Sequence, residues 1–253
     1  MDNLPFPIEY FYEKDRGIVP ARNRLLDEAG EIGSTYLAFF DDEEEVHSDW
    51  LKNLVATARS YQAEAVSGQV RYSLPENCPE WLKKRNFYGG DRPKTGTITK
   101  NAGTNNVLLN LDFLKEHDLR FNMIFSMSGG SDSYLFQEVR ENGGVIISCR
   151  EAVAFESVPK SRATEEWILN RAFKNGYTKI KRSLVRRGKI HAILVFIVYG
   201  LWLRICNLFG HLRYPFLDYS YKVFNRRRPK KIKGMLHAIN GKDYEEYRTI
   251  HGS

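Results

Sequence analysis

Cysteine is scarce in this chain of 253 residues, which contains only Cys78, Cys149 and Cys206. The three lie far apart, form no C-x-x-C pair, and leave one thiol over if two are bridged. This pattern does not fit the disulfide framework of a secreted domain and predicts a reducing, cytosolic setting. The N-terminal segment, MDNLPFPIEYFYEKDRG, also lacks the basic and apolar regions of a secretory signal.

The chain also lacks several site signatures. Its six histidines are not spaced as metal ligands are, and none accompanies a Ser or Cys in the pattern of a catalytic nucleophile. There is no G-x-x-x-x-G-K-S/T phosphate loop and no G-x-G-x-x-G after an expected strand. The sequence therefore gives no reason to predict a histidine zinc site, a hydrolase triad or either of these nucleotide-binding loops.

Charge is unevenly distributed along the chain. Residues 157–253 hold 21 Lys and Arg against 6 Asp and Glu, whereas residues 1–156 hold 17 against 25. The two parts are therefore expected to meet different partners. Charge alone allows the basic part to bind either nucleic acid or anionic lipid, so apolar content must decide between them.

The composition, with 42% hydrophobic and 13% aromatic residues, is sufficient for a packed core. Strand-like and helix-like periods alternate, which predicts an α/β fold with a mostly parallel sheet flanked by helices. The run 36–40, YLAFF, is typical of a strand buried on both faces. Residues 75–100 are rich in Pro, Gly and Lys and form either a ligand-covering loop or plain surface. The other expected elements are strands at 8–12, 65–74, 106–110 and 145–149, and helices from Pro20, over 50–61, 111–117 and 131–142, and from Thr164 to Gly176.

The C-terminal part contains an apolar run, IHAILVFIVYGLWL, at residues 190–203. Arg204 and Asn207 interrupt it short of the roughly 20 residues that a spanning helix needs. Basic clusters flank the run in residues 179–189 and 226–233. We predict an interfacial helix whose basic flanks contact anionic headgroups, with a buried core helix as the alternative.

Carboxylates at the end of the 36–40 strand form the first candidate site. Asp41 and Glu43 follow this strand directly, and alternate residues of an extended chain point the same way. Open α/β sheets bind ligands at the carboxyl ends of strands, and clustered hard oxygens suit Mg²⁺ or Mn²⁺. The alternative is that the five acids from Asp41 to Glu45 merely solvate a loop.

Asp132 is the second candidate, because it follows Gly129 and Gly130 at a helix start, where paired glycines let backbone approach a ligand. An acid in the first helical turn also stabilises the helix dipole without any other role. Thr104 and Asn105 precede an apolar strand and form either a substrate-facing rim or an ordinary turn.

Several segments together resemble glycosyltransferase family 2, which has the GT-A fold. They are GIVPARNRLLDEA, YLAFFDDEE, the WL at Trp50, GTNNVLL, F-x-x-x-F-x-x-SGGSD and FESVPKSRATEEWILNRAFKNGYT. The resemblance runs from Ile8 to Thr178 in the family's order and approximate spacing. It is strongest to bacterial exopolysaccharide glucosyltransferases of the succinoglycan type, and it is more specific than any single motif.

The resemblance implies an inverting hexosyltransferase of surface polysaccharide synthesis. Its donor would be a nucleotide-diphosphate sugar, above all a UDP-sugar, and its acceptor a lipid-linked saccharide. The family's D-x-D carboxylates fall on Asp41 and Glu43, which would hold Mn²⁺ or Mg²⁺, and its catalytic base falls on Asp132. The donor- and acceptor-binding residues implied in the same way are Arg22, Asn23, Asp41, Asp42, Thr104, Asn105, Gly129 and Gly130.

The chain departs from the family in three places. Glu43 stands where Asp is usual, and a glutamate can still bind a metal ion. Ser131 replaces the Glu of the family's Gly-Gly-Glu-Asp motif. The family's first strand, nucleotide-binding loop and second strand are missing, so the donor pocket is expected to be incomplete.

We therefore expect residues 1–178 to form a partial GT-A domain, and residues 179–253 to form a basic helical tail on the inner face of the cell membrane. A catalytically inactive, membrane-bound fragment or scaffold is the first alternative. A nucleic-acid binder is the least favoured, because the aromatic residues of the tail lie in the apolar run and not among the basic residues.

Overall fold

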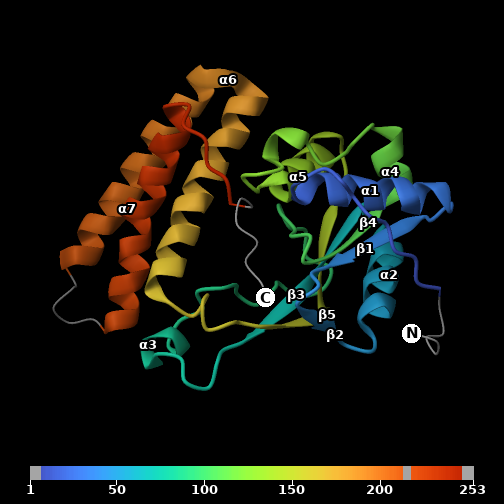
Figure 1. Cartoon of the computed structure of the whole chain (residues 1–253), viewed down its shortest axis with the longest axis horizontal. Coiled ribbons are helices and arrows are strands. Elements are labelled where there is room, and N and C mark those ends of the chain that lie inside the picture. Colours follow the sequence, from blue (N-terminus) through green and yellow to red (C-terminus); the bar gives the residue numbers. More distant parts are fainter. Residues whose placement is uncertain (1–6, 213–217, 247–253) are drawn as a thin grey trace.

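The computed structural model describes residues 7–212 and 218–246, which form a five-stranded sheet flanked by helices (Figure 1). The strands are β1 (Tyr36–Phe40), β2 (Glu44–Val46), β3 (Ala65–Ser73), β4 (Asn106–Asn110) and β5 (Ile146–Ser157). The helices are α1 (Ile18–Glu31), α2 (Trp50–Tyr61), α3 (Glu80–Lys83), α4 (Leu111–Glu116), α5 (Ser131–Glu141), α6 (Glu165–Leu212) and α7 (Tyr219–Ile239), with a short 3-10 helix at Met123–Phe125.

The sheet is mixed, with strand order β1-β4-β3-β5-β2. Only β3 and β5 pair in parallel among the described strands, while β1–β4, β3–β4 and β2–β5 pair antiparallel. The α/β class is confirmed, but the prediction of a mostly parallel sheet was wrong. β1, β3 and β5 run in one direction, and β4 inserts between β1 and β3 in the other. A short strand that is buried on both faces has no sequence pattern that reveals its direction.

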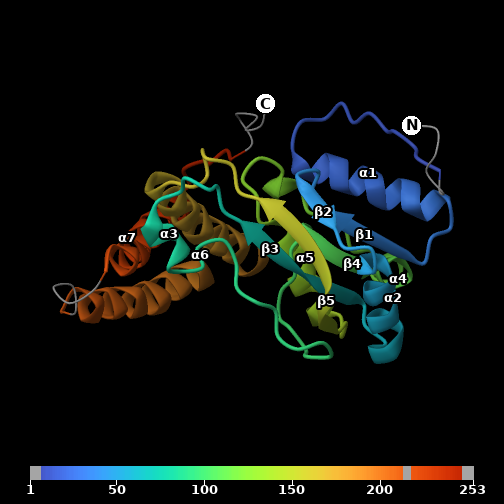
Figure 2. The same cartoon turned by 90° about the horizontal axis from the view of Figure 1, so that it is seen from below.

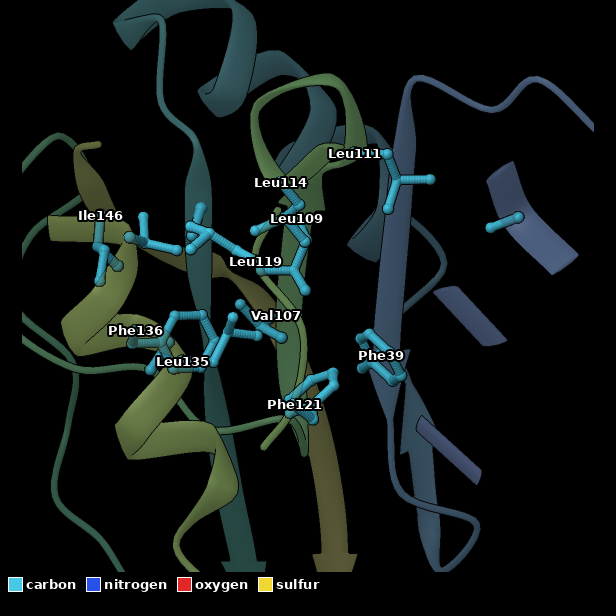
Figure 3. Packing of buried hydrophobic residues seen from close by; sticks show 14 of the residues in the cluster. Phe39, Val107, Leu109, Leu111, Leu114, Leu119, Phe121, Leu135, Phe136 and Ile146 are labelled. Carbon is cyan, nitrogen blue, oxygen red and sulfur yellow. The ribbon is translucent and has the colours of Figure 1, made fainter. Parts of the chain in front are cut away.

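Alternate residues of β4 face two separate cores. Val107 and Leu109 contact the cluster under α1, α4 and α5, whereas Leu108 belongs to the cluster under α2. Leu135 and Phe136 of α5 are fully buried in the first cluster, as Figure 3 shows. Full burial of one such side chain contributes about 1.5–3 kcal/mol. This packing fixes α5 against the sheet.

Residues 8–12 do not form the expected strand. Ile8, Tyr10 and Tyr12 are each more than half exposed. No strand in the described part of the chain lies beside this segment to accept its backbone hydrogen bonds. A favourable local composition is therefore not sufficient to make a strand here.

The helix that was expected to end at Gly176 continues beyond it. A Cβ at Gly176 would lie 2.0 Å from the carbonyl oxygen of Lys231 in α7. Gly234 in α7 is equally close, because its Cβ would lie 2.0 Å from the carbonyl oxygen of Phe173. The two glycines therefore allow the backbones of α6 and α7 to approach each other closely, and Gly176 does not end a helix.

The C-terminal region is a unit of three helical segments. α6 reverses at Gly188, whose φ of 76° and ψ of −179° interrupt the helix, and α7 then returns alongside it (Figure 1). Ile180, Leu203 and Met235 are buried between the segments. Seen from below, this unit lies on the side of the sheet opposite α2 (Figure 2).

One helix in the described residues, Glu165–Gly210, is long and apolar enough to cross a membrane by length and composition. Only 17% of its most apolar stretch is buried within the protein. Burial in a protein core therefore explains the apolar character of only a small part of this stretch.

The first half of α6 is clamped to α5 and to the loop before it. The contacts are Lys181 Nζ to Ser128 Oγ at 2.9 Å, Arg182 Nη1 to the Ser133 carbonyl oxygen at 3.2 Å, and ion pairs of Arg186 with Glu138 and Glu141. The division expected between residues 178 and 179 falls inside this helix. These three basic side chains thus have partners within the protein, where the sequence pattern had favoured lipid headgroups.

Candidate functional site

An acidic corner lies where β1 turns into β2. The Asp41 backbone N–H donates to Glu44 Oε2 at 3.0 Å, and Asn105 Nδ2 donates to Glu44 Oε1 at 3.4 Å. Glu44 is only 6% exposed. Its side chain therefore closes the turn from inside and leaves Asp42 and Glu43 exposed at the surface.

Two carboxyl groups of this corner, those of Glu44 and Asp41, have raised pKa values. Burial raises the pKa of Glu44 to about 7, and the hydrogen bond from the Asp41 backbone opposes that rise. Asp41 is exposed as a whole residue, but the protein around its carboxyl group desolvates it and raises its pKa. The Arg22 guanidinium opposes this rise, whereas Asp42 and Glu43 add to it. Such clustered, incompletely neutralised carboxylates favour the binding of a cation.

Arg162 borders the corner from the loop between β5 and α6. Its Nη1 lies 2.9 Å from Glu43 Oε2 and 3.3 Å from Glu156 Oε1. Burial raises the pKa of Glu156, and Arg162 opposes that rise. Glu156 is the cross-strand neighbour of Glu44. The Arg162 guanidinium is thus paired with Glu43, one of the two carboxylates that the sequence predicted to bind a metal ion.

The start of α5 forms the second half of the site. Gly129 and Gly130 have φ angles of 72° and 95°, a region that favours glycine. A Cβ at Gly130 would also lie 3.1 Å from Cβ of Thr178 in α6. Asp132 lies in the first turn, where its Oδ1 accepts from the Ser133 backbone N–H at 2.6 Å. The paired glycines therefore allow α6 to approach the turn that carries Asp132.

Arg22 connects the two halves. Its Nη1 donates to Ser131 Oγ at 3.1 Å, and it is the cation that most strongly opposes the raised pKa of Asp41. Its guanidinium also lies over the ring of Phe121, 5.5 Å from the ring centroid. One side chain of α1 thereby links the end of β1 to the turn that bears Asp132.

The remaining predicted residues divide between this site and the scaffold. Asn105 reaches the corner through Glu44, and its neighbour Thr104 is 4% exposed. Asn23 has a different contact: its Nδ2 donates to the Phe121 carbonyl oxygen at 2.9 Å, and its Oδ1 accepts from the Phe121 N–H at 3.1 Å. Both ends of this amide hold a loop against α1 and do not join the acidic corner.

The sequence reasoning missed three residues of the site: Glu44, Arg162 and Arg182. Glu44 stands in a run of five acids, so nothing in the sequence separates the one that turns inward. Arg162 and Arg182 become neighbours of the site only through β5 and α6, which begin or continue far from it in the chain. The PKSRATEE segment within the family resemblance was the one available signal for Arg162.

The protein groups alone do not complete a metal site in residues 7–212 and 218–246, where no cluster of three or more His, Cys, Asp or Glu side chains could hold an ion. Mg²⁺ is usually held by one or two carboxylates together with substrate phosphates. Asp41 and Glu43 fit such a shared site, provided that Glu43 exchanges Arg162 for the ion. Asp41 forms no ion pair within the described residues and needs no such exchange.

Comparisons with known proteins find similarity over most of the chain. Residues 2–118 match the family model of Glycosyl transferase family 2. The succinoglycan biosynthesis protein ExoM of Rhizobium meliloti (strain 1021) is 34% identical over 175 residues, which are 69% of this chain and 56% of that protein. The chain therefore spans about half the length of this curated relative.

Solved structures of S. aureus TarS 1–349 are similar at a lower level. The complex with UDP-GlcNAc has a TM-score of 0.44 and 12% identity, over 92% of this chain and 74% of that one. The complex with UDP has a TM-score of 0.38 and 13% identity, over 89% and 72% of the two chains. Likeness at this level carries no argument about the ligands of this chain.

Proposed function

Because the chain belongs to glycosyl transferase family 2, we propose that it is an inverting hexosyltransferase of surface polysaccharide synthesis. The donor is a nucleotide-diphosphate sugar, with UDP-sugars first, and the acceptor is a lipid-linked saccharide. One observation supports the proposal: Arg22 donates a hydrogen bond to Ser131, the neighbour of Asp132, and its charge also acts on Asp41. The relative in succinoglycan biosynthesis supports the type of product.

Asp132 is the proposed general base. In a direct displacement the acceptor oxygen attacks the anomeric carbon, its proton passes to a carboxylate, and the bond to the diphosphate breaks. The backbone N–H of Ser133 fixes Oδ1 of Asp132 and leaves the other carboxylate oxygen for the acceptor. Arg182, which bonds the carbonyl oxygen of the same Ser133, holds this turn from the side of α6.

Asp41 and Glu43 are the proposed ligands of Mn²⁺ or Mg²⁺. When bound, such an ion would neutralise the negative charge that develops on the diphosphate leaving group. Asp42 and Asn105 lie beside this position and are proposed to contact the donor. Arg22, placed between the corner and α5, contributes a fixed positive charge to the same space.

The second half of α6 is the proposed membrane-binding surface. A row of large apolar side chains is exposed along it at three- and four-residue spacing, which places them on one helix face. The row runs for roughly 29 Å at 1.5 Å per residue. The opposite face is packed against the rest of the C-terminal unit through Ala192 and Leu203. The residues of this apolar stripe are Ile190, Leu194, Ile197, Val198, Leu201, Trp202, Ile205, Leu208 and Phe209.

This arrangement favours a helix that lies in the membrane interface at the inner face of the cell membrane. One face of the segment is already occupied by protein, whereas a single spanning helix exposes its whole circumference to lipid. Arg204 is exposed beside the stripe, and a charge is costly deep in hydrocarbon but acceptable at the interface.

A catalytically inactive, membrane-bound scaffold is the second candidate. One observation favours it: β1 pairs with β4 on one side and with no described strand on the other. A hollow of about 580 Å³ beside β1, lined by Tyr36, Ala38 and Val55, also lies open. Such an edge is a common place for another polypeptide to add a strand.

The deciding experiment mixes the purified chain with labelled nucleotide sugars and Mn²⁺, with bacterial glycolipid extract as the source of acceptor. Transfer of label to lipid, with an inverted anomeric configuration in the product, is the expected result. Donor binding without transfer over the whole set of sugars and extracts would favour the scaffold instead.

A further inference from the structure

Two arginines close to the candidate site form no ion pair within the described residues. Arg171 in α6 and Arg227 in α7 form neither a hydrogen bond nor an ion pair with any described residue. Each lies instead over an aromatic ring, Arg171 over Trp167 at 5.0 Å and Arg227 over Phe224 at 5.1 Å. Both side chains are partly buried.

The two cations also act on each other. Burial lowers the pKa of Arg227, and the charge of Arg171 lowers it further. The charge of Arg171 opposes the raised pKa of Glu156, but Glu156 forms its ion pair with Arg162, and Glu165 pairs with Arg226. Like charges that are partly withdrawn from water, without an ion pair of their own, reduce stability. A bound anion would offset this repulsion.

A hollow of about 470 Å³ lies between β3 and the loop after α3, next to the aromatic residues that contact these cations. Phe87 and Tyr88 line the hollow. Arg227 lies 5.9 Å from the ring of Phe87, and Tyr88 stacks on Trp167 at 5.4 Å. The charged side chains that line the hollow are Arg71, Lys83, Arg85 and Asp91. Positive charge therefore predominates in the hollow as well as beside it.

The hollow adjoins the acidic corner. Tyr72 lines it and is the cross-strand neighbour of Glu156 between β3 and β5. Glu156 is bonded in turn to Arg162, which holds Glu43. The hollow is thus connected to Glu43 of the candidate site through Tyr72, Glu156 and Arg162.

We propose that Arg171 and Arg227 bind a phosphate or diphosphate group of the acceptor and place the attached sugar in the hollow. Guanidinium groups bind phosphate through paired N–H donors, and both arginines have all their N–H groups available. A saccharide linked to a lipid through phosphate supplies such an anion. The inference rests on the proposed transferase function only for the identity of the molecule that carries the phosphate.

The test measures binding of inorganic pyrophosphate to the whole chain by calorimetry, at low ionic strength and with EDTA present. EDTA removes divalent ions, so pyrophosphate held through a metal at Asp41 and Glu43 does not contribute. We expect saturable binding by the unaltered chain. Arg171→Gln and Arg227→Gln should each weaken it at least tenfold, because each removes one charged donor group.

Arg226→Gln is the matched control. This neighbour of Arg227 is exposed and already paired with Glu165, so its loss should change the affinity less than twofold. Arg171→Lys and Arg227→Lys keep the charge and should fall between the unaltered chain and the Gln variants. They also keep the test valid if a Gln variant does not fold.

Vesicles of phosphatidylcholine with 30% phosphatidylglycerol separate the two sources of phosphate. Vesicle binding that is unchanged in both Gln variants supports an acceptor phosphate. Vesicle binding that is lost in both would assign the arginines to bilayer headgroups and overturn the proposal. It is also overturned if the unaltered chain shows no saturable pyrophosphate binding, or if Arg226→Gln weakens binding as much as Arg227→Gln. None of these measurements requires sugar transfer, so a failure of the proposed function remains distinguishable.

Discussion

Arg22 and Ser131 lie 109 residues apart in the chain and are joined by a 3.1 Å hydrogen bond from Nη1 to Oγ. Ser131 is also the position at which the chain departs from the Gly-Gly-Glu-Asp motif of the family it resembles. A hydroxyl group accepts this hydrogen bond without adding a negative charge. The charge of Arg22 is therefore left to act on Asp41, whose raised pKa it opposes.

Asp132→Asn should abolish most transfer and leave donor binding nearly unchanged. The amide keeps the shape of the side chain but cannot take up a proton from the acceptor hydroxyl. General-base catalysis contributes roughly 10²- to 10⁴-fold, so the turnover number should fall within that range. Transfer rate and calorimetric donor affinity, measured on the same preparation, check this. A variant that transfers at the unaltered rate would remove Asp132 from the role.

Asp41→Asn and Glu43→Gln should each weaken Mn²⁺-dependent donor binding. Both changes remove a hard anionic oxygen from the ion, and we expect a loss of at least roughly tenfold. Glu45→Gln is the matched control, because Glu45 is an exposed acid of the adjoining β2. Donor affinity is titrated with and without Mn²⁺. Equal Mn²⁺ dependence in Glu43→Gln and in the control would contradict the assignment of Glu43.

Gly176→Ala should destabilise the C-terminal unit. The new Cβ would lie 2.0 Å from the carbonyl oxygen of Lys231, so α6 and α7 must move apart. Overpacking of this kind costs about 1–3 kcal/mol. Gly200→Ala is the control, because the nearest atom to its Cβ is 4.0 Å away on the ring of Phe196. This change should stabilise by about 0.5–1 kcal/mol through helix propensity. Urea unfolding of both variants measures the difference.

Replacing Leu194, Val198, Leu201 and Leu208 by Gln should release the chain from vesicles that contain phosphatidylglycerol. All four side chains are at least 55% exposed in the apolar stripe, so they contribute burial in lipid and little packing within the protein. Each buried side chain of this size contributes about 1.5–3 kcal/mol at full burial, so binding should fall more than tenfold. Co-sedimentation with the vesicles provides the measurement.

The control for this variant changes four exposed apolar residues of the sheet domain to Gln: Leu25, Ile32, Leu51 and Ile98. Vesicle binding of the control should stay within twofold of the unaltered chain. High salt should reduce the binding of the unaltered chain only in part, because screening weakens the basic contacts and not the apolar contribution. Complete release by salt alone would show that the stripe does not enter the lipid.

The acidic corner was predictable because its signal is local. Five apolar residues followed at once by Asp41, Asp42 and Glu43 are a contiguous pattern, and the structure places these acids at the end of β1. The choice of Glu44 as the buried acid was not predictable. It depends on Asn105, which lies 61 residues away in the chain and approaches only when β4 is in place.

The partners of the basic residues of α6, in contrast, could not be predicted from the sequence. In sequence, Lys181, Arg182 and Arg186 form a cluster beside an apolar run, which is the usual pattern of a lipid-facing flank. Their partners in α5 and the loop before it precede them by 45 or more residues. Charge composition alone cannot distinguish a contact inside the protein from a contact with headgroups.

The position of β1 has a consequence for how the chain acquires its structure during synthesis. β1 pairs with β4 alone among the described strands, and Tyr36 lies opposite Asn110. A ribosome that adds about 5–20 residues per second therefore needs several seconds after making β1 to make its partner. Throughout this interval YLAFF is an unpaired, uncharged segment of high β-propensity, which is the composition that promotes aggregation. The five acids that follow it, from Asp41 to Glu45, repel neighbouring copies during the same interval, so they protect the nascent chain before they serve any site.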